Sequence, residues 1–208
     1  LKRTNIKVPK GRSVSSQKLG EAALEVGYPV VLKMISSRLA HKTEAGAVVL
    51  NLEDEDSLNR AVKKMKIDVT DYDPKAVSEL FLVEAMSPNP LAELIINMRQ
   101  DPQFGAALVL GSGGVLVELL ADSVTLLLPT RPVDIIRAIK SLRVGRLLEG
   151  FRGRPAADIS KLAEEIYSLS ITYQENKKTI AEIEINPLFV YQTEVSAIDA
   201  LIQVPVAK

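Results

Sequence analysis

Apolar residues recur along the chain in two patterns, which predict different elements. From Glu55 to Met65 they stand three and four residues apart, which predicts an amphipathic helix. Short apolar runs bounded by Gly, Pro or Asn predict strands. We expect helices at 15–26, 55–65, 132–142 and 158–171. We expect strands at 30–35, 47–52, 80–86, 92–98, 106–110, 115–120, 124–128, 180–185, 188–191 and 195–201.

The order of these segments bears on the fold class. Strands and helices mix without regular strand–helix–strand alternation, which predicts an α+β fold with two lobes. The stretch Ser87-Pro88-Asn89-Pro90 interrupts the pattern. We therefore expect a hinge there, between a smaller lobe of residues 1–87 and a larger lobe of residues 88–208.

The amino-acid composition excludes several classes of function and of catalytic site. The 208 residues carry 26 basic and 26 acidic side chains, which argues against a general nucleic-acid binder and a polybasic membrane clamp. The absence of Cys excludes a disulfide framework, a thiolate metal site and a Cys nucleophile. A single His excludes any site that needs two imidazoles. No apolar run approaches the roughly 20 residues that span a bilayer, so we expect a cytoplasmic protein without a membrane segment or signal peptide.

Lys33 interrupts an apolar strand. Because strand side chains alternate between faces, Lys33 shares its face with Val31 and Ile35. A lone ammonium on an apolar face needs a partner, or must extend to solvent. Lys33 is therefore either a solvent-reaching side chain or a point charge placed to bind phosphate.

The only His lies in the polar loop of residues 36–46. His41 has cationic neighbours in this loop, which favour a neutral, nucleophilic imidazole. Gly46 can bring backbone N–H groups close to an anion. The loop is thus either an anion-binding segment or a solvent-exposed loop with a surface His.

Acidic side chains interrupt the C-terminal strands. Glu182, Glu184 and Asn186 occupy one strand face, and Asp199 stands alone in an apolar run. The turn that the sequence favours places Asn186 opposite the residue after Asp199, and a shift of one residue would put both side chains on one face. Such oxygen donors suit Mg²⁺, which fills its octahedron with water and phosphate oxygens. A solvated sheet face with scattered acids is the alternative.

A glycine-rich turn, Gly111-Ser112-Gly113-Gly114, follows another apolar strand. Such a turn can hold phosphate or can be an ordinary tight turn. It lacks the Lys-Ser/Thr of a P-loop, and no helix is expected after it. The GxGxxG dinucleotide fingerprint is also absent from the chain.

Motifs in a fixed order carry a resemblance that spans nearly the whole chain. Taken together, they resemble the ATP-grasp domain of NDP-forming acyl-CoA synthetases, the β-subunit type of ADP-forming acetate–CoA ligases, which is related to the succinyl-CoA synthetase β chain. The most distinctive are Arg152-Gly-Arg-Pro155 and Glu184-Ile-Asn-Pro187. The others are Gly27-Tyr-Pro-Val-Val-Leu-Lys33, His41-Lys-Thr-Glu-Ala-Gly46, Phe81-Leu-Val-Glu84-Ala-Met86, Glu93-Leu-Ile-Ile96, Asp101-Pro-Gln-Phe-Gly105 and Gly111-Ser-Gly-Gly114 through Glu118.

The resemblance implies an ATP-grasp fold and a nucleotide site in the first half of the chain. Lys33 would contact the nucleotide phosphates, with Gly46 at the end of the loop that closes on them. Glu84 and the backbone up to Met86 would line the adenine and ribose site. Glu93 would be the ribose-side acid.

The resemblance also implies metal and phosphate-relay residues. Asn186 and Asp199 would be the Mg²⁺ ligands. His41 would relay phosphate between a distant acyl-CoA site and the nucleotide, and Glu184 would hold the phosphohistidine. The implied reaction is acyl-CoA + ADP + phosphate in equilibrium with acid + CoA + ATP.

The implied partners follow from what the chain does not contain. No CoA-binding Rossmann domain is evident, so we expect a CoA-binding α subunit or a fused N-terminal domain, in an α2β2 complex or a fused homodimer. One alternative is a non-catalytic regulatory module, such as relatives attach to a lysine acetyltransferase. Another ATP-grasp carboxylate ligase is a third reading, which Arg152-Gly-Arg-Pro155 and His41 disfavour. Ser37, Ala47 and Asn97 depart from the family pattern, which has Pro, Gly and Gly there.

Overall fold

The computed structural model describes residues 4–39, 41–114 and 122–205. It divides into two compact units, Pro9–Pro88 and Asn89–Lys208, the second joined by the N-terminal segment up to Val8. Ile6 is buried in the core of the second unit, and Lys7 exchanges backbone hydrogen bonds with Val195 and Ala197. The N-terminal segment up to Val8 thus belongs with the second unit, whereas the expected first lobe began at residue 1.

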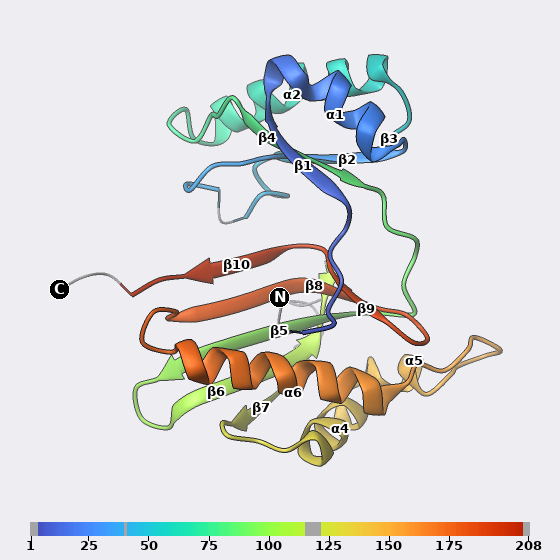
Figure 1. The fold of residues 1–208 in the computed structure, drawn as a ribbon, viewed down its shortest axis with the longest axis vertical. Coiled ribbons are helices and arrows are strands. Elements are labelled where there is room, and N and C mark those ends of the chain that lie inside the picture. The colour runs from blue at the N-terminus through green and yellow to red at the C-terminus, as the bar shows by residue number, and fades with distance from the viewer. Residues whose placement is uncertain (1–3, 40, 115–121, 206–208) are drawn as a thin grey trace. The chain divides into compact units, whose positions relative to one another are not determined.

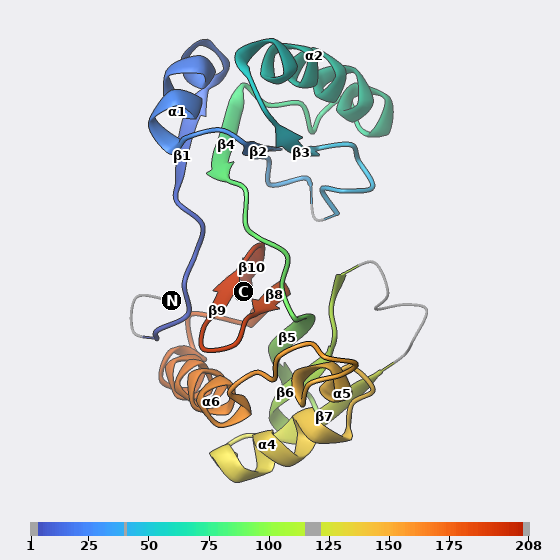
Figure 2. The ribbon, with the colours of Figure 1, turned by 90° about the vertical axis from the view of Figure 1, so that its right-hand side faces the viewer.

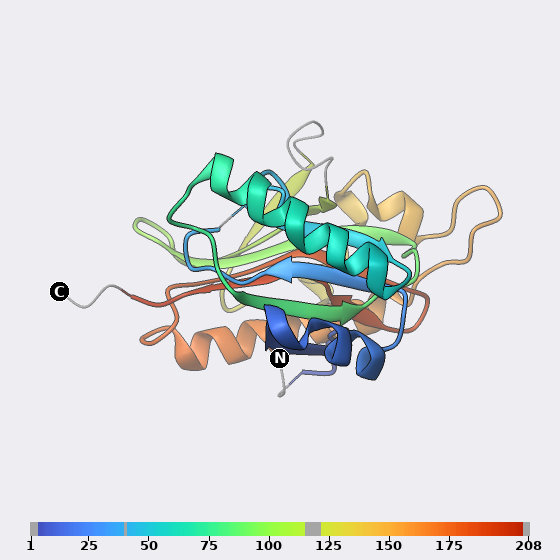
Figure 3. The same ribbon diagram turned by 90° about the horizontal axis from the view of Figure 1, so that it is seen from above.

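The unit Pro9–Pro88 is an antiparallel four-stranded sheet in the order β1-β4-β2-β3. Its strands are β1 (Gly11–Ser15), β2 (Val30–Met34), β3 (Val48–Leu52) and β4 (Leu80–Ala85). Its helices are the short η1 (Ser16–Lys18), α1 (Leu19–Val26) and α2 (Glu55–Tyr72). Both α-helices cover one face of the sheet (Figures 2 and 3).

Local sequence explains the limits of both α-helices. Asp54 and Ser57 form a capping box at the start of α2. Gly27 ends α1 with a positive φ of 96°, as expected of a glycine after a helix. We expected α2 to end near residue 65, but Val69 continues the buried stripe of Leu58 and Met65, so the helix extends to Tyr72.

Strand β1 was not expected. Its five residues include a single apolar side chain, Val14, and the burial pattern is mostly exposed. The strand exists because its backbone pairs with β4, from Gly11 opposite Glu84 to Ser15 opposite Leu80. An edge strand held by backbone pairing carries little hydrophobic pattern.

The second unit is a six-stranded antiparallel sheet in the order β10-β8-β5-β6-β7, with β9 paired to β8. Its strands are β5 (Ala92–Asp101), β6 (Gly105–Ser112), β7 (Ser123–Leu127), β8 (Glu182–Val190), β9 (Val195–Ala197) and β10 (Ala200–Gln203). Helices α4 (Pro132–Ser141), α5 (Gly145–Leu148) and α6 (Ile159–Asn176) lie on one face (Figure 1). Helices combined with antiparallel sheets confirm the α+β class.

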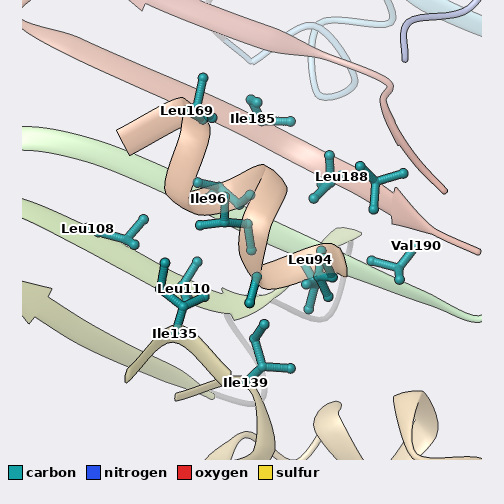
Figure 4. Packing of buried hydrophobic residues seen from close by; sticks show 14 of the residues in the cluster. Leu94, Ile96, Leu108, Leu110, Ile135, Ile139, Leu169, Ile185, Leu188 and Val190 are labelled. Carbon is teal, nitrogen blue, oxygen red and sulfur yellow. The ribbon is translucent and has the colours of Figure 1, made fainter. Parts of the chain in front are cut away.

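The core of this unit lies between the sheet and its helices. Leu94 and Ile96 of β5 point into it, together with Leu110 of β6, Ile135 of α4 and Leu169 of α6 (Figure 4). Residues on the alternate positions of the same strands therefore occupy the opposite face, which the helices of this unit do not cover. That opposite face carries most of the predicted site residues of this unit.

The expected C-terminal strands differ in their limits from the observed ones. The strands predicted at 180–185 and 188–191 form one continuous strand, β8, and the strand predicted at 195–201 divides into β9 and β10. The strand expected at 115–120, with Glu118, lies outside the described residues. None of the helices described is long and apolar enough to span a membrane.

Candidate functional site

Lys33 and Glu84 lie together on the face of the smaller sheet that α1 and α2 do not cover. The register pairs Val31 with Glu84 and Lys33 with Leu82, so the two charged side chains are diagonal neighbours. Lys33 Nζ lies 2.6 Å from Glu84 Oε2, and the side chains are only 7% and 12% exposed. The ammonium therefore has a buried carboxylate partner and does not extend to solvent.

Gly11 makes room for Glu84. It lies directly opposite Glu84 in the β1–β4 pairing. A Cβ at Gly11 would lie 2.8 Å from Glu84 Cγ, which is closer than real Cβ contacts, and 3.1 Å from the Val83 carbonyl oxygen, which is tighter than most of them. Sequence reasoning missed this residue, because a glycine in a short polar segment gives no signal of what lies opposite.

Met86 follows β4 immediately and is hydrogen-bonded to the residue before β2. Its N–H donates to the Pro29 carbonyl at 3.1 Å, and the Ala85 N–H donates to the Lys10 carbonyl at 2.8 Å. The Met86 side chain is partly exposed. The end of β4 is thus fixed from both sides, while the Met86 side chain stays accessible.

The loop that carries His41 is held to α2 at both ends. At its start, Arg38 Nε lies 2.7 Å from Asp73 Oδ2, and this hydrogen bond lowers the Asp73 pKa. At its end, Gly46 has a φ of +65° and approaches α2 so closely that a Cβ would lie 2.7 Å from Asp68 Cβ. The loop therefore needs glycine at position 46.

His41 itself is directed to solvent. Its side chain is 72% exposed, and Nδ1 lies 3.9 Å from Glu44 Oε1. The loop closes on itself through the Ala45 N–H, which donates to the His41 carbonyl at 3.2 Å, and the Gly46 N–H, which donates to the Thr43 carbonyl. A well-defined turn thus presents an accessible imidazole.

Ala47 lies directly after this loop and is fully buried in the core beneath it. Its N–H donates to the Lys42 carbonyl at 2.8 Å, and its carbonyl accepts from the Met34 N–H at 2.9 Å. The extra methyl relative to Gly therefore packs against the core of this unit.

In the second unit, Gly114 brings Glu93 and Asn186 together. Its N–H donates to Asn186 Oδ1 at 3.3 Å. A Cβ at Gly114 would lie 2.1 Å from Glu93 Oε2, and one at Gly113 would lie 2.6 Å from the Leu94 carbonyl carbon. The Gly113–Gly114 pair thus lets the backbone lie against both side chains, and burial raises the pKa of Glu93.

Asn186 and Asp199 face each other across the C-terminal hairpin. Leu188 pairs with Ala197 in β9, and Ile185 pairs with Ala200 in β10, so Asn186 and Asp199 are opposite in the same register. The Asn186 N–H donates to the Asp199 carbonyl at 3.1 Å. The register is one residue away from the one that the sequence favoured, and it equals the one-residue shift that the sequence analysis considered.

A bulge in β8 accompanies this arrangement. Leu94 pairs with Leu188 and Ile96 with Ile185, so one residue of β5 lies opposite two of β8, Asn186 and Pro187. A bulge re-aims side chains and bends the strand. Asn186 thereby stays off the core face while Leu188 returns to it.

The donors at this hairpin suit Mg²⁺ bound with few protein ligands. No group of three His, Cys, Asp or Glu that could enclose a metal occurs in the part of the chain that the structure describes. Asn186 Oδ1 accepts one long hydrogen bond, which leaves its second lone pair for a cation. A carboxylate and an amide oxygen fit an ion that completes its shell with water and phosphate oxygens.

Glu184 has a neighbour that the sequence reasoning did not assign to the site. Asn97 of β5 is paired directly opposite Glu184. Its Nδ2 donates to Glu184 Oε2 at 3.1 Å and to Glu182 Oε1 at 2.5 Å. A polar residue between the apolar Ile96 and Met98 was the available signal.

A cavity of about 350 Å³ lies elsewhere in the second unit and contains none of the predicted residues. Its lining includes Asn5, Lys7, Asp158, Lys161, Glu165 and Glu194. The Asn5 N–H and Nδ2 donate to Glu165 at 2.9 and 3.0 Å, and Lys7 pairs with Glu194. Four of these polar side chains are thus paired with one another, and we assign the cavity no ligand.

Comparison with known proteins identifies the family of the chain and several related ligases. A family model described as an ATP-grasp domain matches residues 1–204. The β subunit of acetate–CoA ligase (ADP-forming) I from Pyrococcus furiosus is 34% identical over 177 residues, 85% of this chain and 75% of that subunit. The 4-hydroxybutyrate–CoA ligase (ADP-forming) of Nitrosopumilus maritimus is 34% identical over 92% of this chain, which spans only 27% of that protein.

A solved structure agrees with these relatives. The dinucleotide-forming acetyl-coenzyme A synthetase 1 of Ca. Korarchaeum cryptofilum, in complex with coenzyme A, Ca-AMPCP and HgCl⁺, matches with a TM-score of 0.87 and 33% identity. The match covers 96% of this chain and 87% of that one. The same enzyme with coenzyme A and Mg-AMPPCP, its phosphohistidine segment pointing towards the nucleotide binding site, matches with a TM-score of 0.78 and 31% identity.

Proposed function

The chain belongs to the ATP-grasp family, and from this premise we propose that it is the nucleotide-binding part of an ADP-forming acyl-CoA synthetase. It would transfer phosphate between a phosphohistidine and ADP in the reaction acyl-CoA + ADP + phosphate ⇌ acid + CoA + ATP. The observation that carries the proposal is the pairing of Asn186 with Asp199, close to Glu184 on the same strand. This pairing would bring metal-binding oxygens and an acid to one face of the sheet.

Several of the predicted site residues would bind the nucleotide. Lys33 supplies a buried positive charge for the phosphates, and it is held in place by Glu84. Met86 and Glu84, at the end of β4, would line the base and ribose. Glu93 would accept hydrogen bonds from the ribose hydroxyls, and Gly46 would present backbone N–H groups to phosphate.

Asn186 and Asp199 would hold the Mg²⁺ that accompanies the nucleotide. When bound, the ion supplies positive charge that neutralises phosphate oxygens. The residues of the chain then orient the nucleotide and exclude water, since phosphoryl transfer depends on alignment and charge neutralisation.

His41 would carry the phosphate as a phosphohistidine. Its exposure on a glycine-ended loop supports this role, because a phosphate-carrying imidazole must be accessible to the groups that give and take the phosphate. In the transfer step, an ADP phosphate oxygen attacks phosphorus, the bond from phosphorus to the imidazole nitrogen breaks, and that nitrogen keeps the electron pair. Glu184 would hold the imidazole by accepting its remaining N–H.

The CoA-binding part of the reaction lies outside this sequence. We propose that a CoA-binding α subunit or a fused N-terminal domain supplies it, in an α2β2 complex or a fused homodimer, in the cytoplasm. The relatives support both arrangements, since this chain covers 75% of a separate β subunit and 27% of a single-chain ligase.

Calorimetric titration with ATP tests the nucleotide and metal site. We expect Mg²⁺-dependent binding to the wild type and at least tenfold weaker binding to Asp199→Asn, which removes a charge and retains the shape. Asp71→Asn, an exposed acid on α2, is the matched control and should bind like wild type. Absence of Mg²⁺-dependent binding in the wild type would contradict the proposal.

A further inference from the structure

Asn97 is a polar residue of β5 that lies next to two acidic side chains of β8. It is only 7% exposed, although it lies on the sheet face that the helices of its unit do not cover. Its neighbours across the β5–β8 pairing are Glu184, directly opposite, and Glu182, two residues away on the same face. A neutral amide is thus enclosed next to two carboxylates.

The amide is oriented entirely towards the acids. Nδ2 has two hydrogens, and it donates to Glu182 Oε1 at 2.5 Å and to Glu184 Oε2 at 3.1 Å. In residues 4–39, 41–114 and 122–205, no Lys or Arg forms an ion pair with either acid. Asn97 is therefore the donor that the two carboxylates share.

This orientation leaves a buried acceptor without a partner. Asn97 Oδ1 is buried, and it accepts no hydrogen bond from any described group. A buried unpaired carbonyl costs free energy, and such groups concentrate where function requires them. The orientation of the Asn97 amide therefore provides donors to Glu182 and Glu184 but leaves its own Oδ1 without a donor.

We propose that Asn97 is a positioning residue for Glu184. By donating to Oε2, it fixes the carboxylate on the sheet face and directs the second oxygen towards an incoming imidazole N–H. Its unpaired Oδ1 adds an acceptor beside that carboxylate. The inference rests on the proposed function, in which Glu184 holds the phosphohistidine.

Formation of phosphohistidine from radiolabelled Mg–ATP, in the full chain, measures this step by rapid quench. For Asn97→Ala we expect a rate constant at least tenfold lower than wild type, with half-saturating ATP changed less than twofold. Gln203→Ala, on β10 opposite Glu182, is the control and should match the wild type. Circular dichroism shows whether each variant folds.

Asn97→Asp separates positioning from packing, and it serves if Asn97→Ala does not fold. An ionised Asp cannot donate and repels both acids, whereas a protonated Asp can donate to one of them. We expect a slow enzyme at neutral pH that recovers relative to wild type as the pH falls. A loss that is the same at every pH would overturn the proposal.

Glu184→Gln distinguishes failure of this inference from failure of the proposed function. If the wild type forms no phosphohistidine, or Glu184→Gln reacts like wild type, the role of Glu184 itself is wrong. If Glu184→Gln is slow and Asn97→Ala is not, only the inference is overturned. If Asn97 acts through Glu184, the double variant loses no more than Glu184→Gln alone, and multiplied losses would contradict it.

Discussion

Lys33 and Glu84 form an ion pair of 2.6 Å in which both side chains are nearly buried. Removing two charges from water costs free energy that an exposed ion pair does not lose. The attraction between the two charges offsets this desolvation cost only while both charges are present. The pair is therefore a weak source of stability but a strict structural requirement. In the proposed function, a phosphate that binds Lys33 would meet an ammonium that is already held in place.

We expect Glu84→Gln to destabilise the chain by about 3 kcal/mol, because it leaves the Lys33 ammonium buried without its carboxylate. Urea unfolding followed by circular dichroism gives the free energy of unfolding. The double variant Lys33→Met with Glu84→Met should recover most of the loss, since apolar side chains replace both charges. It should also bind ATP more weakly.

Glu25→Gln is the control for this measurement, because it removes an acid from the exposed pair with Arg12. An exposed pair contributes about 0 to 1 kcal/mol, so this variant should unfold like the wild type. Equal losses for Glu25→Gln and Glu84→Gln would show that burial of the Lys33 pair has no energetic consequence.

Gly46→Ala should destabilise the chain and slow phosphorylation of His41. The φ of +65° disfavours any Cβ by about 1 kcal/mol, and contact with Asp68 adds to this. Gly27→Ala is the matched control, since Gly27 also has a positive φ but no atom within 4 Å of the added Cβ. A greater loss of unfolding free energy for Gly46→Ala isolates the contact with α2, and equal losses would argue against it.

Glu93→Gln should stabilise the chain without nucleotide and weaken ATP binding. Burial raises the Glu93 pKa, so the folded state holds its proton more tightly than the unfolded state. The stability that this acid contributes is full below its ordinary value of about 4.5 and is lost as the pH rises through the raised pKa. The variant, neutral throughout, should therefore be more stable than wild type at pH 7 and equal to it near pH 4.

ATP titrations complete this prediction. A hydrogen bond to a charged acceptor contributes about 1.5 to 3 kcal/mol, so Glu93→Gln should bind ATP roughly tenfold more weakly. Gln100→Ala, an exposed residue on the same strand, should leave binding unchanged. A Glu93→Gln variant that is less stable than wild type at pH 7 would contradict the burial argument. A variant that binds ATP like wild type would contradict the role of Glu93 in the ribose site.

Hydrophobic pattern predicted the fold where side chains enter a core. Helix α4 and strand β4 are within one residue of their expected limits, since Ile135, Ile139, Phe81 and Val83 give a clear period. Strand β1 is held by backbone pairing and was therefore invisible to such a pattern. The register of the C-terminal hairpin could not be predicted from the hydrophobic pattern, because it depends on turn geometry. A change of one residue in this register changes which residue lies opposite Asn186.

In the candidate site, too, some features could be predicted from the local sequence and others depend on how the strands pair. Sequence analysis singled out Lys33 and Asp199 because each interrupts an apolar run. Their partners could not be predicted, since strand order and register bring Glu84 to Lys33 and Asn97 to Glu184. The close approach of the Gly11 backbone to Glu84 is a property of packed neighbours and leaves no signature in the local sequence, whereas Gly114 lies in a glycine-rich turn that the sequence does show.

Asp122 provides a structural clasp in the second unit that sequence analysis did not find. It accepts hydrogen bonds from the Arg143 and Val144 N–H groups at 3.0 and 3.2 Å and from the Ser112 hydroxyl at 2.7 Å. Burial opposes ionisation of this carboxyl, but these three donors outweigh it and lower the Asp122 pKa. The end of β6 is thereby fastened to the turn between α4 and α5.

The sign of the pH effect follows from the lowered pKa. A carboxyl with a folded pKa below its ordinary 3.8 contributes stability above that value, and the contribution is lost as the pH falls through the lowered pKa. Asp122→Asn should therefore unfold about 1 kcal/mol more easily than wild type at pH 7, because an amide has fewer acceptors. Urea unfolding at pH 7 and pH 3 should show this difference narrowing at the lower pH. A difference that stays constant would mean that Asp122 acts through shape alone, since only the ionised carboxylate accepts all three hydrogen bonds.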